Sequence, residues 1–132
     1  MLIRKYITII IAVTLFMLLQ TKANGQPSKV SEIDNIINNI NIKIGGTLFD
    51  RKRQTDKVVY SVDVDYLSYY NTKNRLASIE RQSSDIRQTK AWEFETAKKD
   101  YDIYRARFSI LDMPTRVYIA TNGVIVFFVY LN

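Results

Sequence analysis

The feature that most constrains the fold is a period-two alternation of apolar and polar residues in two separate segments. In KVVYSVDVDY one parity carries Val58, Tyr60, Val62, Val64 and Tyr66, and Ser61, Asp63 and Asp65 lie on the other. DIYRARFSIL repeats the pattern, with Tyr104, Ala106, Phe108 and Ile110 opposed to Arg105, Arg107 and Ser109. Because successive side chains of a strand point to opposite faces, both segments are predicted to be antiparallel strands with one buried face and one wet face.

The segment TNGVIVFFVYLN predicts a further strand with an unusual composition. Asn122-Gly123 is the residue pair preferred in a two-residue type I′ turn, so the strand is predicted to form a hairpin with TRVYIA. From Val124 to Leu131 every residue is apolar or aromatic, on both parities. We therefore expect this strand in the interior of the sheet, with both faces covered and a helix over one of them. If one face proves open, its apolar side chains are expected to form a partner site.

The other elements complete a small α+β domain. Isoleucines at helical spacing before Gly45-Gly46 predict a helix over residues 29–42. A turn at 71–74 followed by a strand at 75–81 is expected, and residues 91–99 fit either a strand, with Trp92 and Phe94 on one face, or a helix. The predicted fold is an N-terminal helix packed on a curled antiparallel sheet of five to six strands. It resembles the cystatin-like, roll-like or nuclear-transport-factor-like architectures, by fold analogy alone.

The N-terminus predicts export. Arg4 and Lys5 precede the apolar stretch YITIIIAVTLFMLL, which has the length of a signal-peptide core and is shorter than a spanning helix. Cleavage after Ala23 or Gly25 would satisfy the small-residue rule, and residues 26–132 are expected to form one secreted or periplasmic domain. A membrane attachment is expected only through this segment, if it is not cleaved. Cleavage would remove three basic residues and lower the net charge of the chain from +6 to +3. With this mild positive excess we expect no nucleic-acid partner.

The chemical inventory excludes many enzyme classes. The chain has no histidine and no cysteine, which removes Ser-His-Asp triads, thiol nucleophiles and imidazole or thiolate metal sites. Its four glycines form no phosphate-binding motif. We expect no catalytic residue, no cofactor and no metal, and no disulfide can hold the domain together.

Three groups of residues remain as candidates for function. Asp63 and Asp65 lie two residues apart on one strand face, at a separation that suits a pair of catalytic carboxylates. The alternative without function is a solvated strand face, with these carboxylates paired across to Arg105 or Arg107. Tyr66, Tyr69 and Tyr70 cluster at a strand end and suit peptide or glycan contacts, although strands also use tyrosine for ordinary packing. The basic triplet Arg51–Arg53 is expected in a solvated hairpin loop.

These observations favour a non-enzymatic exported module that binds another protein, such as an inhibitor, an immunity-type factor or an envelope accessory protein. Its predicted contacts are the three tyrosines together with Phe127 and Val129 of the apolar strand. The alternative is a small carbohydrate-binding or carboxylate-dependent hydrolytic domain that uses Asp63 and Asp65. The sequence does not determine the oligomeric state.

Overall fold

The computed structural model describes residues 26–64 and 69–131. The chain divides into two compact units, Met1–Glu32 and Ile33–Asn132. Along the chain the described elements are α2 (Gln26–Ile44), β1 (Thr47–Arg53), β2 (Lys57–Asp63), α3 (Tyr69–Gln82), β3 (Ile86–Ala97), β4 (Asp102–Ile110), β5 (Met113–Ala120) and β6 (Val124–Tyr130). The predicted signal segment lies outside the described residues.

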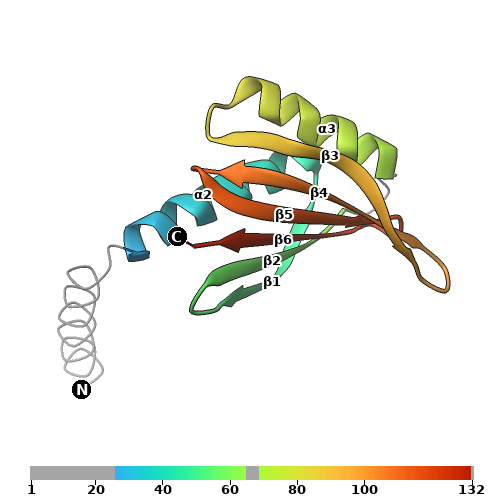
Figure 1. Ribbon diagram of the computed structural model, residues 1–132, viewed down its shortest axis with the longest axis horizontal. Helices are drawn as coiled ribbons and strands as arrows, with labels where there is room; N and C mark the ends of the chain where they lie inside the picture. The colour runs from blue at the N-terminus through green and yellow to red at the C-terminus, as the bar shows by residue number, and fades with distance from the viewer. Residues whose placement is uncertain (1–25, 65–68, 132) are drawn as a thin grey trace, which may run out of the picture. The chain divides into compact units, whose positions relative to one another are not determined.

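The second unit is an α+β structure built on one six-stranded antiparallel sheet that does not close on itself. The strand order is β1-β2-β6-β5-β4-β3, so the last strand of the chain lies near the middle. Figure 1 shows a strongly bent sheet with α3 and the second part of α2 on the same side of it. The core lies between these helices and one face of the sheet, and we call the other face of the sheet the open face.

The helix predicted over residues 29–42 is confirmed as part of α2. Ile33, Ile37, Ile40 and Ile44 recur at helical spacing and are at most 2% exposed. Gly45 ends the helix in a left-handed conformation (φ 71°). Its N–H donates to the carbonyl of Ile42 (3.2 Å), and Gly46 N–H donates to that of Asn41 (2.9 Å). This is the Schellman arrangement, which satisfies carbonyls that the helix leaves free and which glycine adopts without steric cost.

The strand expected at residues 75–81 is wrong, because this segment belongs to helix α3 (Tyr69–Gln82). The helix buries Thr72, Leu76 and Ile79, which are four and three residues apart. That spacing is helical, and it outweighs the turn preference of Asn71 and Asn74. The segment left open at 91–99 is mostly strand, since β3 extends through Ala97. Trp92 contacts the ring of Phe108 on the core side, whereas Glu93 pairs with Arg105 on the other side, as the alternation predicted.

Two tight turns set the pairing of the last three strands. The hairpin at Asn122-Gly123 is confirmed, but its two-residue type I′ turn is wrong: only Gly123 has a positive φ (100°). The loop has three residues, and Gly123 N–H donates to the Ala120 carbonyl (3.0 Å), as in a turn followed by a glycine bulge. Instead, Leu111 (φ 51°) and Asp112 (φ 62°) form the two-residue turn with positive φ, between Ile110 and Met113.

Strand β6 lies in the sheet interior, as predicted, between β2 and β5. The expectation that both of its faces are covered is only half met. Ile125, Phe127 and Val129 are buried against the helix side, whereas Val124, Val126, Phe128 and Tyr130 are half-buried on the open face. Among the residues that the structure describes, the only helices are the two on the other side of the sheet, so no helix covers this second apolar face.

Candidate functional site on the open face of the sheet

An apolar strip runs along the open face over β6 and its two neighbours. We define the apolar strip as Val59, Tyr118, Val124, Val126 and Phe128. The strand register places Val59 opposite Phe128 on one side, and Tyr118 opposite Val126 on the other. The rings of Tyr118 and Phe128 meet edge to face, with centroids 5.5 Å apart. All five side chains are half-buried, because they pack against one another. No layer among the described residues covers them.

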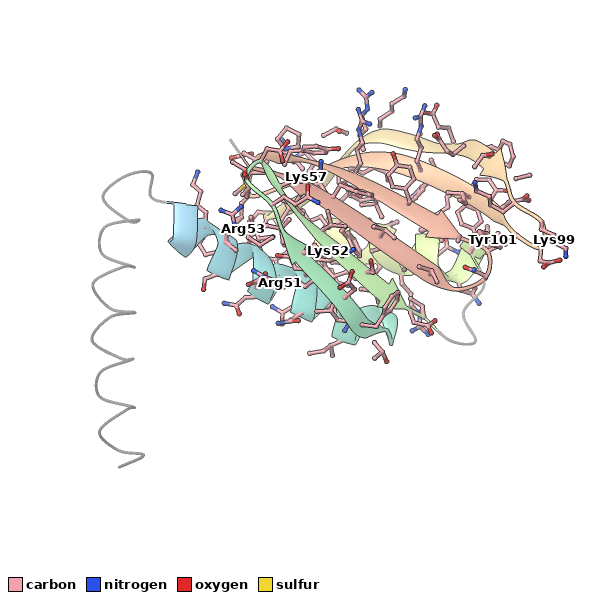
Figure 2. All side chains as sticks on the ribbon, turned by 90° about the horizontal axis from the view of Figure 1, so that it is seen from below. Arg51, Lys52, Arg53, Lys57, Lys99 and Tyr101 are labelled. Atoms are coloured by element: carbon pink, nitrogen blue, oxygen red, sulfur yellow. The ribbon has the colours of Figure 1, made fainter. Side chains whose placement is uncertain are left out.

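One end of the apolar strip is hollowed. A cavity of about 230 Å³ lies beside the β5–β6 turn, and its lining is largely apolar: Tyr101, Ile103, Tyr118, Ala120, Asn122, Val124 and Val126. Figure 2 shows Tyr101 and Lys99 at the end of the sheet that lies away from the β1–β2 hairpin. The strip therefore continues into a concave apolar recess, a shape that a protruding side chain of a partner could fill.

A second cavity, of about 460 Å³, is lined by residues of β3, β4, β5, β6 and the β4–β5 turn, and we call it the arginine pocket. Its lining is Thr89, Arg107, Phe108, Ser109, Asp112, Pro114, Thr115, Arg116 and Tyr130. Arg107 and Arg116 are directly opposite each other in the β4–β5 ladder. Among the described side chains neither guanidinium has an ion-pair partner within 4.0 Å. The guanidinium of Arg116 lies 6.0 Å from the centre of the Tyr130 ring.

Two other arginines of the sheet, Arg51 and Arg105, are paired with carboxylates. Arg105 contacts Glu93 (2.9 Å) and Glu95 (2.8 Å) on the open face. The hydrogen bond from Arg105 lowers the pKa of Glu93, with help from the charge of Lys90. On the helix side Arg51 donates two hydrogen bonds of 2.9 Å to the carboxylate of Asp34. The arginine pocket therefore differs from these sites in carrying two adjacent guanidinium groups without this compensation.

The predicted partner-binding residues do not come together in one site. Phe127 and Val129 are at most 1% exposed, so their side chains lie in the core and not on the open face. Tyr69 is half-buried and stacks on Tyr104, with ring centroids 4.0 Å apart. Burial and the neighbouring Tyr104 raise the pKa of Tyr69. Tyr70 is 65% exposed, and Tyr66 lies outside the described residues.

Of the two predicted catalytic carboxylates, Asp63 and Asp65, the structure describes only Asp63. Asp63 is half-buried at the end of β2, and Asp65 lies outside the described residues. The suggested pairing of Asp63 with Arg105 or Arg107 is wrong, since β6 and β5 lie between β2 and β4. No cluster of three or more acidic residues suited to a metal ion occurs within residues 26–64 and 69–131.

The basic triplet lies on strand β1 rather than in the hairpin loop that we expected. Figure 2 shows Arg51, Lys52, Arg53 and Lys57 around the β1–β2 hairpin. Arg51 pairs with Asp34, and Lys52 lies 3.8 Å from a carboxylate oxygen of Asp50. With two of its three charges compensated, the triplet does not form a continuous basic surface.

Sequence reasoning did not select Arg116. For β6 it expected a partner site on any face that proved open, but the contacts it named, Phe127 and Val129, lie in the core. The two-residue turn at Leu111-Asp112 places Arg107 opposite Arg116, so locating that turn would have paired them. Leu-Asp is not a typical pair for such a turn, which is why the signal was missed. For β6, the parity of Val58, Tyr60 and Val62 defines the core face, and pairing β2 with β6 would have assigned Phe127 to it.

Comparison with known proteins gives no family for this chain. No family model matches the sequence, and no curated protein matches it significantly. None of the described helices has the length and apolar character needed to cross a membrane.

Proposed function

We propose that this protein is an exported, non-enzymatic module that binds another protein through the apolar strip on the open face of its sheet. The observation that carries the proposal is the apolar open face of β6. Val124, Val126 and Phe128 lie side by side near the middle of the sheet, where the described chain provides no cover. Contiguous apolar surface of this kind commonly marks a site of protein association.

The edges of the sheet are less suited to a partner strand than its face. Edge strand β1 has a register irregularity between Leu48 and Asp50 and ends in the basic triplet. Edge strand β3 has three register irregularities along its pairing with β4. Bulges and charges of this kind protect an edge against pairing with another chain. They favour docking on the face of the sheet over addition of a strand at its edge.

The charges around the apolar strip indicate the character of the partner. Lys57 lies at one end, with its ammonium 5.7 Å from the centre of the Tyr130 ring. Arg116 is opposite Phe128 in the β5–β6 pairing. A partner surface with an apolar centre and carboxylates at its rim would complement this arrangement.

Export through the N-terminal segment, and a cystatin-like or nuclear-transport-factor-like fold, are part of the same proposal. The basic residues, apolar core and small residues before Gln26 support export. A helix packed on a bent antiparallel sheet supports the fold analogy. The mass of the protein isolated from the source medium or envelope tests the first point, because cleavage after Ala23 or Gly25 leaves a defined N-terminus.

The binding proposal is tested by affinity capture with matched variants. The mature protein is immobilised and exposed to the extracytoplasmic fraction of its source, alongside Val126→Lys and Thr55→Lys. Both variants add the same charge, but Val126 lies in the apolar strip and Thr55 in the exposed β1–β2 loop. We expect wild type and Thr55→Lys to recover one protein in stoichiometric amount, and Val126→Lys to lose it. Circular dichroism and thermal unfolding verify that each variant is folded.

Three outcomes contradict the proposal. Equal recovery of the partner by Val126→Lys would show that the apolar strip is not the contact surface. Recovery of glycan alone would favour a carbohydrate-binding function. Recovery of only this chain itself, with a dimer in analytical ultracentrifugation that Val126→Lys dissolves, would assign the apolar strip to self-association.

A further inference from the structure

We propose that the arginine pocket binds a small organic anion, a carboxylate or phosphate group attached to an apolar or aromatic body. This inference goes beyond the protein partner proposed above. The pocket and the apolar strip have different linings, and Arg116 is shared only as a charge at the rim of the strip. Tyr130 and Arg116 line the pocket and neither belongs to the strip. Failure of one proposal therefore leaves the other standing.

The first argument is the placement of two like charges. Arg107 and Arg116 are cross-strand neighbours, and like charges in this position destabilise a sheet. The described structure compensates Arg51 and Arg105 with carboxylates, but not these two. A bound anion would turn the repulsion into a pair of charge-assisted hydrogen bonds. Guanidinium groups match the planar geometry of carboxylate and phosphate oxygens, which makes an oxyanion the best complement.

The second argument is the remaining lining of the pocket. Ser109 and Thr89 bring hydroxyl groups that donate to an oxyanion, and the Tyr130 ring and Pro114 offer apolar surface for the rest of a ligand. The volume of about 460 Å³ is within the range of small-molecule sites. A bare inorganic ion would leave most of this space unused, so the ligand is expected to carry an apolar body.

One group in the lining opposes an anion. The carboxylate of Asp112 also lines the pocket, and no described cation lies within ion-pair distance of it. Asp112 has a left-handed backbone (φ 62°), which asparagine adopts about as well as aspartate. Asp112→Asn therefore removes the negative charge with little strain in the turn. It provides a variant whose expected effect is a gain in affinity.

The test is a titration of the mature protein, followed by amide chemical shifts in NMR spectra. The probes are phenyl phosphate and benzoate. Inorganic phosphate is the control that has the anionic group without an aromatic body, and benzyl alcohol is the control that has the aromatic body without an anionic group. We expect saturable shifts on β4 and β5 with the first two probes and much weaker ones with the controls. The response to phenyl phosphate against benzoate tells which oxyanion is preferred.

Variants then separate a built site from general attraction to a basic protein. Arg116→Gln is expected to weaken binding about tenfold, the loss of one charge-assisted contact. Arg81→Gln, which removes the same charge from exposed α3, is expected to change the affinity less than about twofold. Asp112→Asn is expected to strengthen binding about threefold, as relief of an exposed repulsion.

Several results would overturn the proposal. Absence of saturable shifts with both aromatic anions would do so. So would equal losses in Arg116→Gln and Arg81→Gln, since binding would then follow net charge alone. Unchanged affinity in Asp112→Asn would place the anion elsewhere. If benzyl alcohol bound as tightly as phenyl phosphate, the guanidinium groups would have no role.

Discussion

The Tyr60 side chain allows a prediction about alkaline pH that depends on one buried hydroxyl. Tyr60 is 1% exposed, and its hydroxyl donates a hydrogen bond to the carboxylate of Asp34, which also receives two hydrogen bonds from Arg51. Burial, and then the hydrogen bond to Asp34, raise the pKa of Tyr60 well above its ordinary value of 10.0. The core thus holds the phenol in its neutral form.

The sign of the effect follows from where the proton is lost first. Above about pH 10 the unfolded chain releases the Tyr60 proton while the folded chain keeps it, so the stability is fully present below that pH and falls as the pH rises. The loss from this group is about 0.4 kcal/mol at pH 10 and about 1.4 kcal/mol at pH 11. Tyr60→Phe has no such loss, but it gives up the hydrogen bond, which costs about 1 kcal/mol at neutral pH.

The order of stability of wild type and Tyr60→Phe should therefore reverse as the pH rises. At about pH 8 wild type is expected to be more stable than Tyr60→Phe by about 1 kcal/mol, and at about pH 11 the variant is expected to be slightly more stable. Urea unfolding followed by Trp92 fluorescence measures both free energies across this range. All other titrating groups are common to the two proteins and cancel in the difference. A difference that stays constant from about pH 8 to 11 would refute the reasoning.

Three further predictions concern turns and a surface ion pair. Gly45→Ala places a Cβ on a left-handed residue (φ 71°) and is expected to lower the free energy of unfolding by about 1 kcal/mol in urea denaturation. Leu111 also has a left-handed backbone (φ 51°), and Leu111→Asn replaces it by a residue that tolerates this conformation. The substitution should raise the free energy of unfolding by about 0.5 kcal/mol. A decrease would mean that Leu111 contributes more to stability by packing than it costs in backbone strain. Arg105→Gln removes the hydrogen bond that lowers the pKa of Glu93, so an NMR titration of that carboxyl should show its pKa rising toward the ordinary value.

The strands were predictable where one face is wet, and less so where the chain carries mixed signals. In β2 the buried residues Val58, Tyr60 and Val62 alternate with half-buried ones, as the sequence pattern indicated. Helix α3 was mistaken for a strand because its asparagines favour turns locally, whereas its burial depends on residues that are helically spaced. Tertiary packing decided between these two preferences, and a local pattern does not contain that packing.

The candidate site was less predictable than the fold, because it depends on which strands are neighbours. Arg107 was visible as a polar position on a strand, but its pairing with Arg116 follows from a turn at Leu111-Asp112 that lacks the usual residues. Phe127 and Val129 were selected for their apolar character alone. Only the register with β2 shows that they face the core and that Val126 and Phe128 face outward.

The open face of β6 is best understood from the strands beside it. On that face β2 carries Ser61 besides the apolar Val59, and β4 carries Arg105 and Arg107, so the strands beside β6 partly follow the rule that an uncovered face is polar. The rule fails along the apolar strip, for example where Val126 is opposite Ser61 on one side and Tyr118 on the other. An apolar centre surrounded by polar neighbours is the arrangement of a protein interface, whose core is dry and whose rim is charged. Because the side chains that hold the fold point to the other face, the binding proposal predicts that Val126→Lys abolishes partner binding while leaving the core intact, so loss of binding without unfolding is the expected result.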